Sequence, residues 1–161
     1  MIAIAAITKN GVMGDSSTLS LPWPKQSEDM VWFKEKTTQH NNLLFGRRTW
    51  EGMKIKRLPN RNVFVLGRSH VGEPLDSSVK FISSIEEPGY IDFCVCGGRE
   101  IYQQFIPSCE SLYLTVFDFE VEENKNTIKF PFYEKDLHIL FDKVTVVKQI
   151  NGGVIKHYEL Q

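Results

Sequence analysis

The sequence predicts an α/β domain built on a mainly parallel β-sheet with helices on both faces. Two observations support this fold class. Short apolar runs typical of buried strands alternate with helix-like segments along most of the chain, and this alternation favours parallel strands joined by helices. The tail instead places two apolar runs around Asn151-Gly152-Gly153, residues that tolerate positive φ in a tight turn. An antiparallel hairpin is therefore expected to finish the sheet.

The individual elements follow from the same patterns. Strands rich in β-branched and aromatic residues are expected from Ile2, Asn42, Asn62, Val79 and Tyr90. Helices are expected at Ser27–Thr38, Arg48–Met53 and Arg99–Phe105, with a weak turn near Ser84–Glu87. Strands without intervening helices are expected from Ser111, His138 and Val154. The polar stretch from Glu122, with its Phe-Pro-Phe insert, is expected to be a surface loop.

Composition and charge exclude several classes of protein. The chain has 161 residues, of which 42% are hydrophobic and 24% charged, as in ordinary soluble domains. A net charge of -1 gives no general basic field for nucleic acid or an anionic membrane. The N-terminal apolar run is too short for a signal sequence or membrane span. We therefore expect one cytoplasmic domain over residues 1–161, with the monomer as its default state.

The cysteines and histidines give no pattern of a metal centre. Cys94, Cys96 and Cys109 suit a reducing compartment better than a disulfide framework. Cys94 and Cys96 alternate within an apolar run, so both are expected in the core on one face of a strand. No Cys/His spacing typical of zinc is present in the sequence. No metal site is expected.

Glycines end three of the predicted strands, and polar or basic residues follow each of them. The three segments are Gly46 before Arg47, Arg48 and Thr49, Gly67 before Arg68 and Ser69, and Gly97-Gly98 before Arg99. Each segment alone is weak evidence, since charged turns are common. Together they indicate a phosphate-bearing ligand at the carboxyl edge of the sheet. The fingerprint G-x-G-x-x-G is absent after these strands, so this is not an ordinary Rossmann turn.

Two acids, Glu28 and Asp29, follow the predicted N-cap Ser27. The helix dipole favours acids in a first turn, which explains most such pairs. A sharper interpretation is that one of them points inward to hold a polar ligand. Helical periodicity does not decide which, because both acids have apolar residues three and four positions later.

Taken in order, the segments of this chain resemble those of dihydrofolate reductases. The matching segments are MG (Met13-Gly14), LPW (Leu21–Trp23), DMVWFK (Asp29–Lys34), GRRTWEGM (Gly46–Met53), LPNRNVFVLGR (Leu58–Arg68), CGGREIYQQFIP (Cys96–Pro107), LYLT (Leu112–Thr115) and FP (Phe130-Pro131). The resemblance implies a central mixed sheet of eight strands, mostly parallel, with an antiparallel C-terminal strand. It also implies NADPH-dependent reduction of 7,8-dihydrofolate to 5,6,7,8-tetrahydrofolate, which supports one-carbon metabolism and thymidylate synthesis. Partners would be dihydrofolate and antifolate-type small molecules, without nucleic acid or membrane.

The resemblance also assigns roles to individual residues, with Asp29 as the acid that holds the pterin and Glu28 as the outer acid. The implied catalytic residues are Asp29, Trp23, Tyr102 beside the nicotinamide, and Thr115, which supports the acid by a hydrogen bond. The implied substrate pocket contains Ala6, Met30, Phe33, Met53, Thr115 and Arg61, the last gripping the α-carboxylate of the glutamate tail. The implied cofactor contacts are Met13, Gly14, Gly46, Arg47, Arg48, Thr49, Gly67, Arg68, Gly97, Gly98 and Tyr102.

Further features of the family carry over, with some departures. Gly97-Gly98 matches a pair joined by a cis peptide, and residues 11–23 match a mobile loop that closes over the cofactor. Glu100 stands where some relatives have a basic cofactor contact, and the loop at Glu122–Lys129 lacks the usual Gly-Asp-Thr run. Two alternative functions are a related reductase of riboflavin synthesis and a binding module without turnover. The acid at Asp29 and the LPW loop argue against the first, and the matched acid, lid and arginines against the second.

Overall fold

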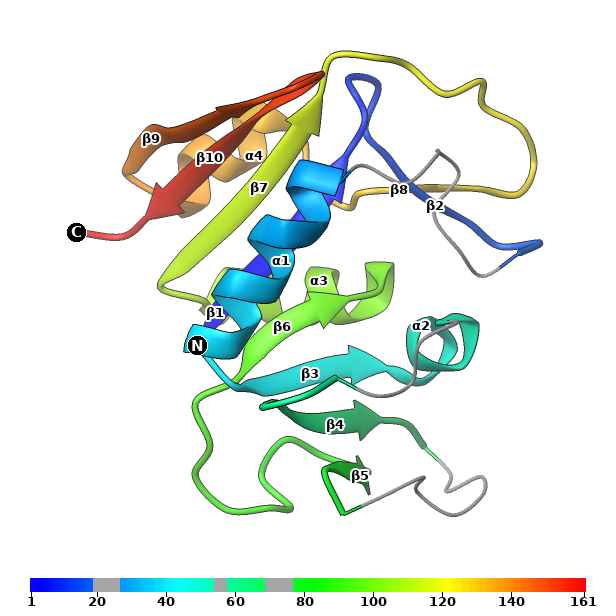
Figure 1. The fold of residues 1–161 in the computed structure, drawn as a ribbon, viewed down its shortest axis with the longest axis vertical. Coiled ribbons are helices and arrows are strands. Elements are labelled where there is room, and N and C mark those ends of the chain that lie inside the picture. Colours follow the sequence, from blue (N-terminus) through cyan, green and yellow to red (C-terminus); the bar gives the residue numbers. More distant parts are fainter. Residues whose placement is uncertain (19–26, 54–57, 69–76) are drawn as a thin grey trace.

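The computed structural model describes residues 1–18, 27–53, 58–68 and 77–161. Its centre is an eight-stranded sheet in the order β5-β4-β3-β6-β1-β7-β10-β9 (Figure 1). The strands are β1 Ile2–Ile7, β3 Asn42–Gly46, β4 Asn62–Leu66, β5 Val79–Ile82, β6 Cys94–Gly97, β7 Ser111–Phe117, β9 Lys143–Ile150 and β10 Gly153–Glu159. Neighbouring strands from β5 to β7 are parallel, whereas β10 is antiparallel to both β7 and β9. The predicted mixed, mostly parallel sheet with its C-terminal hairpin is confirmed.

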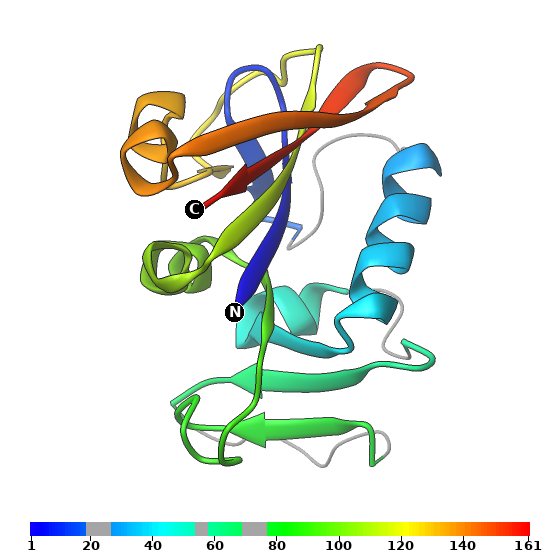
Figure 2. The same ribbon diagram turned by 90° about the vertical axis from the view of Figure 1, so that its left-hand side faces the viewer.

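Helices cover both faces of this sheet (Figure 2). Alternate residues of β1, β3, β4, β6 and β7 belong to different buried clusters, as the pleat of a β-strand requires. Ile4 and Leu43 lie in one cluster with Trp32 of α1 (Ser27–Gln39) and Trp50 of α2 (Arg47–Gly52). Ala3, Ala5 and Leu44 lie in the other cluster, which includes residues of α3 (Arg99–Phe105) and α4 (Glu134–Leu140). Cys94 and Cys96 are both in the first cluster, as predicted for one face of a strand.

The carboxyl ends of three parallel strands meet at one edge of the sheet. Gly46 at the end of β3 pairs with Leu66 of β4, and Phe45 pairs with Gly97 at the end of β6. The predicted glycine-ended segments therefore lie side by side, although each belongs to a different part of the chain.

A second, smaller sheet was not expected from the sequence. Strand β2 (Val12–Asp15) pairs in antiparallel fashion with β8 (Thr127–Lys129). The prediction of a surface loop from Glu122 is therefore wrong for Thr127–Lys129, which pair with β2 as a strand. This pairing joins segments more than a hundred residues apart in the sequence.

The tail contains a helix that the apolar pattern did not reveal. The strand predicted from His138 is confirmed only from Lys143, where β9 begins, since α4 covers residues 134–140 and a short break separates the two. The Asp136 carboxylate accepts a hydrogen bond of 2.7 Å from the Tyr133 backbone N–H, which stabilises the first turn. Leu137 and Phe141, four residues apart, are buried on one helix face. The run Ile139–Phe141 is apolar enough to resemble a strand, but Ile139 is exposed and the buried positions, Leu137 and Phe141, follow the helical period.

Two further observations complete the fold. A short 3-10 helix, η1 (Ile106–Ser108), follows α3 directly. The helices among the described residues are all too short or too polar to cross a membrane.

Candidate active site

Asp29 and Thr115 come together between α1 and β7, which lie side by side in Figure 1. The Thr115 hydroxyl donates a hydrogen bond of 2.7 Å to Oδ1 of Asp29. Burial raises the pKa of Asp29, and the hydrogen bond from Thr115 opposes this change. The first turn of α1 thus directs a carboxyl group inward, where one of its oxygens is fixed by a buried threonine.

Glu28 turns in a different direction and has its own partner. Its Oε1 accepts a hydrogen bond of 2.8 Å from the backbone N–H of Asn151, in the turn between β9 and β10. The outer acid therefore connects α1 to the hairpin turn, a role beyond the favourable helix dipole considered for it. Of the two acids that periodicity left equivalent, Asp29 is the inner one, as the resemblance implied.

The residues expected to form the substrate pocket are only partly assembled around Asp29. Ala6 lies directly opposite Thr115 in the pairing of β1 with β7. Phe33 and Met53 are partly buried against the cluster that contains Trp32. Met30, next to Asp29 in α1, is 40% exposed.

Arg61 is buried, with only 7% of its surface exposed, and is held by two hydrogen bonds. Its Nη1 donates to Oγ1 of Thr37 at 3.0 Å, and its Nε donates to the carbonyl of Pro59 at 3.1 Å. The Thr37 hydroxyl in turn donates to the carbonyl of Phe33 at 2.6 Å. Burial lowers the pKa of Arg61, although an arginine stays charged at any physiological pH. The guanidinium is thus oriented from the last turns of α1.

Sequence reasoning missed Thr37. The available signal was its position four residues after Phe33, which places both side chains on one helix face.

Two segments, Gly46–Thr49 and Gly97–Ile101, approach each other closely at the carboxyl edge of the sheet, and we call this meeting the glycine contact. The Gly97-Gly98 peptide is cis, as the resemblance implied. A Cβ atom on Gly98 would lie 2.5 Å from Oγ1 of Thr49, and one on Gly46 would lie 2.9 Å from Cγ1 of Ile101. Glycine is required here because neighbouring atoms occupy the space of a side chain.

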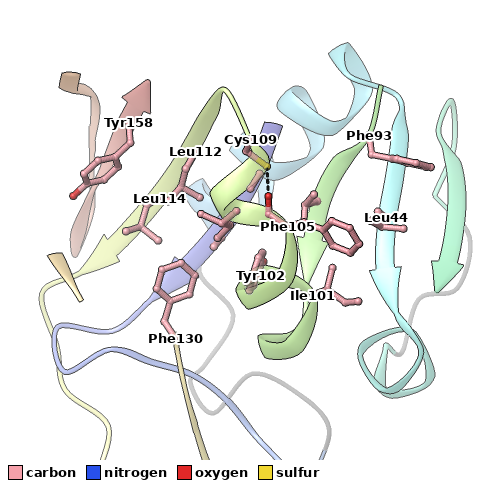
Figure 3. Close-up of a cluster of buried hydrophobic side chains, with 14 of the residues drawn as sticks. Leu44, Phe93, Ile101, Tyr102, Phe105, Cys109, Leu112, Leu114, Phe130 and Tyr158 are labelled. Carbon is pink, nitrogen blue, oxygen red and sulfur yellow. Dashed lines mark hydrogen bonds between the residues drawn. The ribbon is translucent and has the colours of Figure 1, made fainter. Parts of the chain in front are cut away.

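Tyr102, in α3, lies next to the glycine contact. Its hydroxyl donates a hydrogen bond of 2.7 Å to the carbonyl of Ile4, and its ring contacts Phe130 edge to face (Figure 3). Burial raises the pKa of Tyr102 well above its ordinary value, and the nearby Cys96, Cys94 and Asp29 act in the same direction. The phenol therefore stays protonated, which suits a residue that shapes the site.

The expected cofactor residues lie in three parts of the fold, namely after β3, after β4 and in β2. Arg47 is paired with Glu51 at 2.8 Å, whereas Arg48 and Arg68 are exposed beyond the ends of β3 and β4. Met13 and Gly14 lie in β2, which belongs to the smaller sheet. Gly67 follows β4 and donates its N–H to the carbonyl of Ile82. Trp23, the remaining expected catalytic residue, lies outside the described residues.

These observations fit a phosphate-bearing dinucleotide. Glycines end two adjacent strands, the hydroxyl of Thr49 lies against Gly98, and two cationic side chains stand at adjacent strand ends.

Comparison with known proteins agrees with this arrangement. The sequence model of the dihydrofolate reductase family matches residues 1–152. A dihydrofolate reductase from Buchnera aphidicola is 35% identical over 122 residues, covering 73% of this chain and 72% of that protein. Dihydrofolate reductase type 5 from Escherichia coli is 32% identical over 146 residues and covers 87% of each chain.

A solved structure extends the agreement to the fold. Dihydrofolate reductase from Enterococcus faecalis complexed with NADP(H) and RAB-propyl superposes with a TM-score of 0.71 at 29% identity, covering 98% of this chain and 92% of that one. These matches agree with the inward carboxyl on α1 and with the glycine contact. The chain belongs to the dihydrofolate reductase family, enzymes that reduce dihydrofolate with NADPH.

Proposed function

We propose that this enzyme transfers a hydride from nicotinamide C4 to C6 of the pterin ring while N5 gains a proton, and that the product serves one-carbon metabolism and thymidylate synthesis. NADPH supplies the hydride when bound. The observation that carries the proposal is the inward Asp29 carboxyl held by Thr115.

Asp29 suits both orientation and proton supply. A pterin offers a 2-amino group and a ring N–H, which match the two oxygens of a carboxylate. Thr115 donates to Oδ1 and so fixes the plane of that carboxylate. Because burial raises the pKa of Asp29, the carboxyl keeps a proton to higher pH and can pass it toward N5 through a water molecule. Its negative form then stabilises the positive charge that develops on the pterin.

Arg61 suits the other end of the substrate. Its guanidinium is fixed by Thr37 and Pro59, and a planar fork of donors matches the α-carboxylate of the glutamate tail. Asp29 lies on the first turn of α1, and Arg61 is held by Thr37 on its last turn. Because α1 has 13 residues and rises about 1.5 Å per residue, this separation fits an elongated substrate.

The reaction assignment is tested by following isotopic label into the product. With NADPH deuterated at the transferred C4 position, NMR of the tetrahydrofolate is expected to show deuterium at C6 only. With ordinary NADPH in heavy water, C6 is expected to carry hydrogen from the cofactor. Label at C7, or solvent deuterium at C6, would contradict the proposal.

Cofactor preference provides a second prediction. Replacing Arg48 or Arg68 by alanine is expected to reduce the preference for NADPH over NADH, because a 2′-phosphate requires positive partners. The loss of one charge-assisted hydrogen bond corresponds to about 1.5–3 kcal/mol, or roughly 10- to 100-fold in affinity for NADPH. The measurement is kcat/KM with each nucleotide.

Arg47→Ala is the matched control, because Arg47 is adjacent to Arg48 and already paired with Glu51. Its effect on the preference is expected to be smaller. If neither Arg48→Ala nor Arg68→Ala changes the preference, the phosphate assignment is wrong.

A further inference from the structure

A row of aromatic rings connects β10, β7 and α1 on the face of the sheet that carries Asp29. The His157 imidazole stacks on the Tyr113 ring, with centroids 4.1 Å apart and planes 8° from parallel. Tyr113 meets Trp32 edge to face at 5.8 Å. Nζ of Lys36 lies 4.7 Å from the Tyr113 centroid and 5.0 Å from the Trp32 centroid. Strand β10 thereby reaches α1 through a series of ring contacts.

This row contacts the same two elements that hold the catalytic acid. Tyr113 stands two residues before Thr115 in β7, so their side chains lie on one face of the strand. Trp32 stands three residues after Asp29 in α1, so it lies on the same side of the helix. The contacts Asp29–Thr115 and Trp32–Tyr113 are therefore successive points of one helix–strand interface.

His157 is an unusual residue for the end of such a row. Its side chain is only 17% exposed, and its Nε2 is buried without a hydrogen-bond partner in the described part of the chain. The charged and titratable groups that face it are Tyr113 from β7, Lys36 from α1, Lys143 from β9 and Glu159 from β10.

These surroundings keep the imidazole neutral. Burial lowers the pKa of His157, the two lysines act in the same direction, and Glu159, 3.6 Å from Nδ1, opposes them. A neutral ring can stack on Tyr113 without repelling the Lys36 ammonium that contacts the same tyrosine.

We propose that His157 is a positioning residue for Asp29. Its flat ring fixes Tyr113, and Tyr113 in turn fixes the position of Trp32, and so of α1, against β7. The inference rests on the proposed role of Asp29 in proton supply. Nothing in the contacts requires His157 to touch substrate or cofactor. Its effect would reach the reaction only through the helix that carries the acid.

Removal of the ring is expected to let α1 relax and admit water to Asp29. The pH profile of hydride transfer, measured in single turnovers by the loss of reduced-nicotinamide absorbance, has an apparent pKa that belongs to Asp29 and the pterin together. In His157→Ala we expect this profile to shift toward acid by about half a pH unit or more, since hydration favours the charged carboxylate. The KM for dihydrofolate is expected to rise with it. His157→Phe, which keeps a flat ring, is expected to retain the normal profile.

His138→Ala is the matched control. Like His157, His138 contacts a tyrosine ring, that of Tyr158 in β10, with centroids 6.1 Å apart. This contact lies on the opposite face of the sheet, which α4 covers. Its removal deletes a histidine–tyrosine contact without a route to α1, and the profile is expected to stay unchanged. A shift in His138→Ala equal to that in His157→Ala would overturn the proposal.

Two other outcomes would also overturn it. One is a His157→Ala enzyme with reduced thermal stability and an unchanged pH profile, which would make the ring merely structural. The other is a shift in His157→Phe as large as in the alanine variant. If the alanine variant does not fold, His157→Leu replaces it, since leucine fills the volume without a flat ring and must produce the same shift.

The test separates this inference from the proposed function. If Asp29→Asn keeps both the normal rate and the normal profile, the role of Asp29 is wrong. If Asp29→Asn abolishes the pH dependence of hydride transfer while the His157 variants keep the normal dependence, only the positioning role of His157 is wrong.

Discussion

Replacement of Asp29 by asparagine is expected to reduce reductase activity near neutral pH by about 10²–10⁴-fold, the range for loss of a positioned acid or base. An asparagine preserves the acceptor for Thr115, whose hydroxyl is 2.7 Å from Oδ1 of Asp29. It removes the negative charge that stabilises a protonated pterin and the proton that Asp29 supplies. The measurement is the rate of NADPH absorbance loss with saturating dihydrofolate, together with its dependence on pH.

Glu28→Gln provides the control for this change. The two acids are adjacent, and glutamine keeps an oxygen that can accept from the Asn151 N–H. Most activity is therefore expected to remain. A greater loss in Glu28→Gln than in Asp29→Asn would show that the inner and outer acids have been exchanged.

The same Asp29→Asn variant is expected to be more stable than the natural protein. Because the folded state raises the pKa of Asp29, the folded protein holds its proton to higher pH than the unfolded chain does. Stability is thus lost as pH rises from the ordinary carboxyl pKa through the raised one. Asparagine does not ionise and so avoids this loss. Each kcal/mol of unfolding free energy gained is expected to raise the melting temperature by about 2–4 °C. Thermal unfolding without ligand should show a gap between the two proteins that widens from acid to neutral pH.

Replacement of Gly97 by alanine is the second change with a large expected effect. Gly97 has φ +128°, a conformation that residues with a side chain rarely adopt, and forcing one into it costs of the order of 1–3 kcal/mol. Its new Cβ would also lie 3.4 Å from the Tyr102 hydroxyl and 3.6 Å from Cγ2 of Thr49. We expect the free energy of unfolding in urea to fall by this amount and the affinity for NADPH to fall as well, because the backbone at the end of β6 must shift to relieve the strain.

Gly89→Ala separates the two effects. Gly89 has φ +90° in an exposed turn, and a Cβ there would meet nothing within 4 Å. It should lose stability through backbone strain alone and bind NADPH normally. If Gly97→Ala binds NADPH as tightly as Gly89→Ala does, the glycine contact is not part of the cofactor site.

Local patterns predicted the elements whose burial is regular. The strands β1, β3, β4 and β7 were placed from apolar runs, α3 was placed at its observed bounds, and the hairpin turn at Asn151-Gly152-Gly153 followed from residues that accept positive φ. These features depend on near neighbours in the sequence. For α4 the same reasoning failed, because an apolar run of four residues has no period long enough to distinguish a helix from a strand.

The sequence by itself determined the fold class, the glycine-ended strands at one sheet edge and, through its ordered motifs, the family. The family resemblance indicated Asp29 as the inner acid, whereas only the tertiary structure shows the partners that hold the two acids, because Thr115 is 86 positions away from Asp29 and Asn151 is 123 positions away from Glu28. It likewise decided that His157 stacks beside the helix of the catalytic acid. Periodicity describes the surroundings of a residue within its own element, whereas these partners are brought together only when separate elements pack.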